Sequence, residues 1–422
     1  MQRQNSLIMI IDGGIPVDKV VDISETREEN MLERVCPVCS SGQHYSVHSV
    51  NFEDNIGLLS GYNVVACSDC GMVFATPLPE PSVFEHYYTT LSKYDSSLEN
   101  ISIYDQERFQ LITKFISTFL KNETRVLDLG CGSGGLLREL KKFGYTHLFG
   151  LDPSKAVADY YEGRKSNIKV FTGYLETCEI PRENTYDLII LEAVLEHIPD
   201  VHAFLGNVLK LLSKDGLLYI GVPNLWEFKK CNDGPFQQFS IEHINYFSSV
   251  SLNNLMNEKN LSMLSIEQIM LPGAPGIFAS GIMGIWKREI NKMNNTIVKD
   301  NYGLEALKDY ITLSMMMLNN IEEILKSVKQ NEREIYVWGT GTHTFRLLAA
   351  TSLGTCNIKA FIDMNPHYVG RLVRNIPIKL PGSWLDSSTP ILISSKIAQS
   401  EIEQYIKTDL KLSNPIIKLY RD

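Results

Sequence analysis

The fold is decided by residues 126–135, VLDLGCGSGG, in which a short apolar segment ends at a glycine-rich loop. Gly130, Gly132 and Gly134 let the backbone of such a loop approach a ligand where any side chain would collide. The preceding segment has the pattern of a buried strand, and residues 134–144, GGLLRELKKFG, have that of a helix. A strand, a glycine loop and a helix in this order predict a nucleotide-binding site.

Helical and strand-like segments alternate on both sides of this loop. Helices are expected at residues 105–120 and 203–213, and strands at residues 147–152, 187–194 and 216–223. Such alternation indicates a parallel, doubly wound α/β sheet. A helical stretch at about 281–331 leads to a second set of strands, expected at residues 334–343, 359–366, 390–395 and 415–420. The chain therefore predicts a second, smaller α/β domain.

The length and composition of the chain limit its class. Its 422 residues predict two or three domains rather than one core. Its apolar runs are far shorter than the roughly 20 residues of a membrane span, and its N-terminus lacks the pattern of a signal peptide. We therefore expect a cytoplasmic protein with no membrane partner. The net charge of -9 argues against a nucleic-acid surface, which needs clustered Lys and Arg.

Two CxxC pairs, CPVCSSG and CSDCGMVF, place four cysteines in a metal-ligand pattern, at Cys36, Cys39, Cys67 and Cys70. Each pair turns two thiolates toward one point, and four thiolates in tetrahedral geometry bind zinc at about 2.3 Å. A redox centre would need one pair and a thioredoxin-like βαβ context, which this segment lacks. We expect a structural zinc ion, because four thiolates leave no open position for water or substrate.

Zinc ribbons often hold nucleic acid, but the charge of this module argues against that alternative. Residues 35–100 contain one basic residue, Lys93, against seven Asp and Glu residues. A surface with this excess of acidic residues does not favour the binding of phosphate groups. The module is expected to pack on its neighbour and to supply one wall of a pocket, with Tyr87, Tyr88 and Tyr94 as candidates to stack on a substrate or donate hydrogen bonds to it.

The loop also satisfies GxGxxG, through Gly130, Gly132 and Gly135, so a nicotinamide dinucleotide is an alternative ligand. Asp128, two positions before the first glycine, would repel a pyrophosphate, whereas it could meet the amino group of a methionine moiety. Asp152, at the end of the next predicted strand, is placed to accept hydrogen bonds from ribose hydroxyls. A helix also precedes the first strand. Asp128 and this preceding helix favour S-adenosylmethionine (SAM) as the ligand.

DLGCGSGG and LEAVLEHIPD resemble motif I and the segment after the fourth strand of class I SAM methyltransferases. The resemblance implies a Rossmann-like core that binds SAM. It adds Pro153, the backbone of Leu175 and Glu192 to the expected cofactor contacts, with Glu192 near the methionyl end. Tyr174 stands where the family commonly has an acid that meets the adenine amine.

The order of cysteine pairs, ATPLPEPSVFEHYYTTLSKY, SAM core, EHINYFS and a terminal α/β domain resembles the sugar C-methyltransferases, from Cys36 onward. That family acts on nucleotide-activated keto-deoxysugars. The resemblance implies that His243 removes the proton next to the keto group, with Glu242 beside it and His197 as a second active-site histidine. A histidine suits this task because its ordinary pKa of about 6.5 lets it accept a proton near neutral pH. Where the family has a tyrosine near the sugar, this chain has Ser240.

Several interpretations of function follow, and the favoured one is C-methylation of a nucleotide-diphosphate deoxysugar held in a cleft between the zinc module and the core. An O-methyltransferase for a sugar or a secondary metabolite would need the same base. A zinc-ribbon RNA methyltransferase is disfavoured by the acidic ribbon, and a silent binding protein by the intact glycine loop. Under another interpretation of EHINYFS, the stretch only begins the sixth strand of the sheet.

The expected domain order is an N-terminal extension at residues 1–34, a zinc-binding module at 35–100, the SAM core at 101–265, and a helical linker with a smaller Rossmann-like domain at 266–422. The extension ends in the charged run SETREENMLER, which is expected to form an arm or a short helix. We expect a small-molecule substrate as the partner, and a monomer or homodimer.

Overall fold

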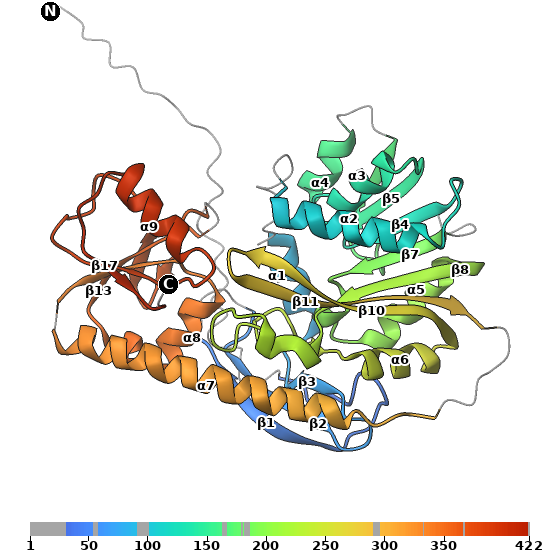
Figure 1. Ribbon diagram of the computed structural model, residues 1–422, viewed down its shortest axis with the longest axis horizontal. Coiled ribbons are helices and arrows are strands. Elements are labelled where there is room, and N and C mark those ends of the chain that lie inside the picture. The colour runs from blue at the N-terminus through green and yellow to red at the C-terminus, as the bar shows by residue number, and fades with distance from the viewer. Residues whose placement is uncertain are drawn as a thin grey trace, which may run out of the picture.

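The computed structural model describes residues 31–53, 58–90, 101–162, 167–178, 180, 186–289, 296–331, 333–365 and 368–420. Most of the expected N-terminal extension and Tyr94 lie outside these residues. The described chain forms three sheets, which Figure 1 shows in a core on one side, a C-terminal domain on the other and an N-terminal module below the core. No helix in the described ranges is long and apolar enough to cross a membrane.

Within the described residues, the core sheet has seven strands in the order β10-β11-β8-β7-β4-β5-β6. Strands β4 to β8 run parallel, as the alternation of helices and strands predicted, and β10 and β11 add an antiparallel hairpin at one edge. The bounds are β4 Arg125–Leu129, β5 His147–Asp152, β6 Ile168–Thr172, β7 Tyr186–Glu192, β8 Leu212–Val222, β10 Leu261–Ala274 and β11 Ile277–Arg288. The Rossmann-like α/β core is thus confirmed.

Helices cover both faces of this sheet because its strands are apolar on both faces. Alternate residues of a strand point to opposite faces. Val126 of β4 packs with α2, α3 and α4 on one face, whereas Leu127 packs with α5 and α6 on the other (Figure 1). The helices span α2 Ile103–Ser117, α3 Gly135–Lys142, α4 Lys155–Glu162, α5 Val201–Leu211 and α6 Ser249–Glu258. The loops after the parallel strands are left at one edge, where such sheets bind ligands.

The helical stretch expected at about 281–331 is wrong in its first part, because residues up to Arg288 belong to strand β11. Trp286 packs on one face of the sheet and Ile285 on the other. A strand buried on both faces is a continuous apolar run, which periodicity cannot distinguish from a buried helix. The core sheet therefore continues past the expected boundary at residue 265, and the linker helix α7 spans Asn301–Gln330.

The N-terminal module is a small antiparallel sheet in the order β1-β2-β3-β9, with helix α1 after β3. Its last strand comes from the core part of the chain: β9, Asn245–Tyr246, pairs with β3. The interpretation in which EHINYFS begins the sixth strand of the core sheet is therefore wrong. The other elements are β1 His44–Asn51, β2 Gly61–Cys67, β3 Val73–Thr76 and α1 Pro81–Thr90.

The C-terminal domain contains a sheet in the order β14-β15-β13-β12-β16-β17, in which β12, β13, β16 and β17 occupy the expected segments. Helix α7 runs past the N-terminal sheet to this domain (Figure 1), and its buried side chains join the two parts in one apolar cluster. The bounds are β12 Ile335–Trp338, α8 Thr342–Ala350, β13 Ile358–Ile362, β14 Leu372–Val373, β15 Ile376–Lys379, β16 Ile391–Ile393, α9 Gln399–Thr408 and β17 Ile416–Lys418.

Arg346 of α8 joins three parts of the chain. Its Nη1 donates a hydrogen bond to Pro235 O at 3.2 Å, and its Nη2 donates to Phe239 O. The guanidinium is buried and lies 5.2 Å from the centroid of the Phe52 ring, in the N-terminal module. Burial lowers the pKa of Arg346, yet the two carbonyl groups satisfy part of its hydrogen-bonding capacity. The C-terminal domain thereby holds the loop that leads to Glu242.

His343, one turn before Arg346, should make the fold sensitive to acid. It is buried, its Nε2 lies 2.7 Å from Tyr420 Oη, and burial lowers its pKa to about 3. Below about pH 6.5 the His343 side chain binds a proton in the unfolded chain but not in the folded chain. The contribution of the neutral His343 to the unfolding free energy is therefore complete above that pH, and it is lost as the pH falls toward 3. At pH 5 the loss is about 2 kcal/mol.

Urea unfolding of His343→Gln at several pH values checks this. The unfolding free energy of the variant should fall less than that of the wild type between about pH 7 and pH 5, because the variant has no proton to bind at this position. His147→Gln, which changes an exposed histidine, is the control, and its unfolding free energy should depend on pH with the same slope as that of the wild type. Equal slopes in His343→Gln and the wild type would contradict the prediction.

Candidate functional site

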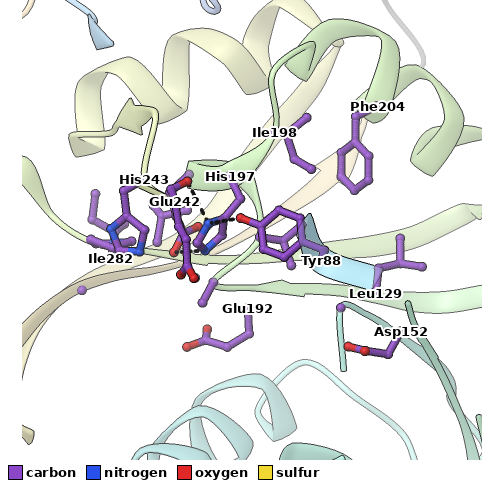
Figure 2. A pocket seen from close by; sticks show the side chains of 18 of the residues that line it. Tyr88, Leu129, Asp152, Glu192, His197, Ile198, Phe204, Glu242, His243 and Ile282 are labelled. Carbon is purple, nitrogen blue, oxygen red and sulfur yellow. Dashed lines mark hydrogen bonds and ion pairs between the residues drawn. The ribbon is translucent and has the colours of Figure 1, made fainter. Parts of the chain in front are cut away.

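A cavity of about 440 Å³ lies at the carboxyl ends of the parallel core strands, between the core and helix α1. Open α/β sheets bind ligands in crevices at this position. Figure 2 shows the rings of His197 and His243 side by side in the cavity, with Tyr88 next to His197 and Asp152 farther along. The expected site residues that line the cavity are Tyr87, Tyr88, Gly130, Asp152, Pro153, Leu175, Glu192, His197, Glu242 and His243.

The glycine loop lies at one end of the cavity. Gly130 has a φ of 74°, and a Cβ atom there would lie 2.9 Å from Val194 Cγ2, so the position requires glycine. Asp152, at the end of β5, accepts hydrogen bonds from Gly132 N and Ser154 N, each at 2.9 Å. The Asp152 carboxylate thus fixes the loop and also borders the cavity, where ribose hydroxyls are expected.

Three other expected cofactor residues lie away from the main cavity. Asp128 and Gly132 line a smaller cavity of about 120 Å³ beside it. Burial raises the pKa of the Asp128 carboxyl group well above its ordinary value. Gly134 lines neither cavity: its φ is 70°, and a Cβ atom there would lie 2.3 Å from Tyr161 Oη. Gly134 therefore serves the close packing of α3 against α4.

Arg108 of α2 lines both cavities, although no sequence motif indicated it. It is the one Lys or Arg among the described residues that line either cavity, and its Nη1 lies 3.8 Å from Glu192 Oε1. Tyr219 donates a hydrogen bond to the other oxygen of Glu192 at 2.9 Å. Arg108 belongs to a helix that precedes the glycine loop, and the packing of α2 against α3 and β10 brings it to the site.

His197 and Glu242 are joined in another part of the cavity wall. His197 ends a short 3-10 helix, Leu195–His197, and its Nδ1 lies 3.0 Å from both Glu242 O and Tyr88 Oη. A carbonyl oxygen can only accept, so Nδ1 carries a hydrogen and donates it to Glu242 O. In the neutral ring, Nε2 then has the lone pair. The ring of His243 lies at right angles to this imidazole, with centroids 4.9 Å apart.

Hydroxyl groups hold the loop that presents Glu242 and His243. Ser240, expected as a substrate contact, does not line the cavity. Its Oγ instead accepts hydrogen bonds from Glu242 N at 3.2 Å and His243 N at 3.0 Å. Tyr87 donates to Glu242 Oε1 at 2.7 Å, and Tyr246 Oη lies 2.9 Å from His243 O. Ser240 therefore fixes the turn rather than the substrate.

Glu196, which no sequence motif indicated, lies in the cavity wall beside His197. Its side chain is 2% exposed, and burial raises its pKa to about 8. Oε1 lies 3.9 Å from His197 Nε2, and Oε2 has no hydrogen-bond partner among the described residues. The sequence LEHIPD does not indicate that Glu196 is buried. The burial depends on the segment around β9, which covers the 3-10 helix.

The four expected zinc ligands meet at one point of the N-terminal module. Cys36 Sγ lies 3.5 Å from Cys70 Sγ, Cys39 Sγ lies 3.5 Å from Cys67 Sγ, and all four atoms lie within 4.8 Å of one another. Sulfur atoms about 2.3 Å from a tetrahedral zinc ion are about 3.8 Å apart. The cluster therefore has the donor set and the size for such an ion. It packs against the apolar cluster that includes α5 and α6 of the core.

The part of the chain that contains the cavity is similar in sequence to known proteins. Residues 103–266 match the family described as "Methyltransferase domain". C-methyltransferase NovU of Streptomyces niveus is 24% identical over 347 residues, which cover 80% of this chain and 79% of that protein. A ubiquinone biosynthesis O-methyltransferase of Rhodopseudomonas palustris (strain HaA2) is 30% identical over 102 residues, which cover 24% of this chain and 40% of that protein.

Solved structures show similar chains. The 1,6-didemethyltoxoflavin-N1-methyltransferase of Burkholderia thailandensis, bound to 1,6-didemethyltoxoflavin and S-adenosylhomocysteine, is 18% identical, with a TM-score of 0.37. The match covers 53% of this chain and 98% of that chain. The two relatives found by sequence differ in the acceptor atom that their names give and share methyl transfer. The protein is a SAM-dependent methyltransferase with a class I methyltransferase core.

Proposed function

We propose that the protein transfers a methyl group from SAM to a carbon next to the keto group of a nucleotide-diphosphate deoxysugar. The observation that carries this proposal is the wall formed by His197, Glu242 and His243 in the same cavity as the glycine loop. Similarity to C-methyltransferase NovU over 79% of that protein supports it. The cavity, at about 440 Å³, is of ordinary size for a small-molecule site.

Methylation at carbon needs a base, because the C–H bond beside a keto group must lose its proton before the carbon becomes a nucleophile. His243 serves as this base, held by the turn at Ser240 and by Tyr246. Tyr88, whose Oη lies 3.0 Å from His197 Nδ1, presents a hydroxyl hydrogen that stabilises the negative charge as it develops on the keto oxygen. When bound, SAM supplies the activated methyl group. Tyr87 holds the Glu242 carboxylate, whose charge stabilises the protonated base.

The cofactor contacts follow from the two cavities. Asp152 and Pro153 border the main cavity where the ribose is expected, and Leu175, in the turn after β6, lines the same cavity. The methionine part of SAM fits the smaller cavity, which Asp128 and Arg108 line. Arg108 then pairs with the carboxylate of SAM, because it supplies a positive charge at the junction of the two cavities. Charge-assisted bonds of this kind contribute roughly 1.5–3 kcal/mol.

Methylation of a hydroxyl group on a sugar or a secondary metabolite is the second candidate. Similarity to the ubiquinone biosynthesis O-methyltransferase supports it, over 24% of this chain. A hydroxyl acceptor would also need His243 as a base, so the residues of the wall suit both reactions. The greater extent of the similarity to NovU favours carbon.

We also propose that Cys36, Cys39, Cys67 and Cys70 hold a structural zinc ion. Four thiolates complete the coordination of the ion, so it supports the fold rather than the chemistry. The cluster is followed by β3 and α1, which carry the pairing with β9 and the side chains of Tyr87 and Tyr88. Loss of the ion should therefore disturb the acceptor wall as well as the module.

Substitution of Arg108 tests the cofactor contacts. Arg108→Gln should weaken SAM binding about tenfold or more, because one charge-assisted contact to the carboxylate is lost. Isothermal titration calorimetry measures this without an acceptor. Lys114→Gln, on the exposed face of the same helix, is the matched control. If Arg108→Gln binds SAM with wild-type affinity, Arg108 does not contact the cofactor.

Hydrogen exchange tests the base. Incubation of a nucleotide-linked keto-deoxysugar with the enzyme in deuterated water should exchange the proton next to the keto group without SAM, since proton removal precedes methyl transfer. His243→Gln should slow this exchange by about a hundredfold or more. His202→Gln, which changes a histidine outside the cavity, should exchange at the wild-type rate. Exchange by His243→Gln at that rate would refute the base assignment.

Metal analysis tests the zinc. Freshly purified protein should contain one zinc per chain, and Cys39→Ser should contain less and unfold at a lower temperature, because metal binding contributes to folding. Cys356→Ser is the control, since Cys356 lies outside the cluster. If freshly purified wild-type protein contains no zinc and Cys39→Ser unfolds at the wild-type temperature, a structural zinc ion is excluded.

A further inference from the structure

Glu196 has a buried oxygen atom that the structure leaves without a partner. Its side chain is 2% exposed, and Oε2 makes no hydrogen bond to any described residue. Buried polar atoms are nearly always hydrogen-bonded, so an unpartnered carboxyl oxygen in a cavity wall points to a ligand. The other oxygen of Glu196, Oε1, lies 3.9 Å from His197 Nε2.

Two imidazole rings complete a cluster with Glu196. One donor atom from each of Glu196, His197 and His243 lies within 4.8 Å of the other two. The Nδ1 hydrogen of His197 is directed to Glu242 O at 3.0 Å, so Nε2 is the nitrogen on the Glu196 side. Histidine ligands of metal ions are commonly oriented in this way, by a hydrogen bond from the second ring nitrogen to a carbonyl oxygen.

We propose that Glu196, His197 and His243 form a second metal site, which binds a divalent transition-metal ion such as Zn²⁺, Co²⁺ or Ni²⁺. Two imidazoles and one carboxylate are a common donor set for these ions. Donor atoms about 2.0–2.2 Å from a tetrahedral ion are about 3.3–3.6 Å apart, so the cluster, whose donor atoms lie within 4.8 Å of one another, closes by up to about 1.5 Å on binding. His243 is half-buried and can make this movement. Three protein ligands leave one position open to the cavity.

The metal ion and the acceptor chemistry compete for the same imidazole. This consequence rests on the proposed function, in which His243 removes a proton. A metal-bound nitrogen has no lone pair with which to accept that proton, so the ion inhibits methyl transfer. Inhibition is competitive toward the acceptor and not toward SAM, because the ion occupies the histidine wall rather than the glycine loop.

Titration of the zinc-loaded protein with Co²⁺ tests the site directly. We expect native mass spectrometry to show one Co²⁺ ion per chain beyond the zinc. The d–d absorption of cobalt should appear without the thiolate charge-transfer bands that exchange at the four cysteines would produce. Glu196→Gln should weaken Co²⁺ binding about tenfold or more, and so should His243→Gln. Glu258→Gln, which removes the carboxylate 3.2 Å from His202 at the surface, is the matched control and should not.

The outcomes separate this site from the proposed function. Absence of a second ion overturns the site, and so does equal affinity in the wild type, Glu196→Gln and His243→Gln with unchanged circular dichroism. Binding is measured without an acceptor, so a second ion supports the site even where keto-sugar methylation is not found. If Co²⁺ binds and raises the rate of methyl transfer, the site is supported, and the inhibitory consequence and the base role of His243 are overturned.

Discussion

The functional site depends on the pairing of two short strands that lie far apart in the sequence. Asn245–Tyr246 of β9 adds to the edge of the N-terminal sheet beside β3. Arg34 reinforces this contact: its Nη1 donates to Ala75 O at 2.9 Å, and its Nη2 donates to Asn245 Oδ1 at 2.8 Å. Asn245 in turn donates to Leu195 O at 2.9 Å, in the 3-10 helix of His197. One strand pairing thereby brings Glu242, His243 and His197 to the cavity.

The same constraint explains why the chain needs more than its SAM core. The core supplies the glycine loop and His197, but Tyr87 and Tyr88 come from helix α1 of the N-terminal module. The C-terminal domain does not line the cavity within the described residues, yet Arg346 reaches the carbonyl groups of the loop before Glu242. The cluster of four cysteines lies in the same N-terminal module, and Arg346 of α8 supports the loop from the C-terminal domain. The turn that carries Glu242 and His243 is thus held by contacts from Ser240 and Tyr246, and Tyr87 binds the Glu242 carboxylate.

Much of the fold follows from local patterns in the sequence. The parallel strands are short apolar runs between helices, and the cysteine spacing requires two turns that face each other. Strand β11 could not be recognised, because a strand buried on both faces has no period that separates it from a helix. Strand β9 could not be placed either, since its partner β3 lies about 170 residues earlier, and pairing over that distance leaves no local signal. Glu196 and Arg108 were missed for the same reason: their burial and position are properties of the packed chain. Ser240 lies next to the cavity residues Glu242 and His243 in the sequence, but its hydroxyl group accepts hydrogen bonds from their backbone N–H groups and does not line the cavity.

In the proposed reaction, this wall of histidines and carboxylates acts on a carbon acid. Enzyme supplied with SAM labelled with ¹³C in its methyl group and with a nucleotide-linked keto-deoxysugar gives a product that NMR can assign. If the methyl group is transferred to carbon, it shows one-bond coupling to the ring carbon next to the keto group. A labelled methyl group on oxygen, with no carbon–carbon coupling, would contradict the proposed reaction.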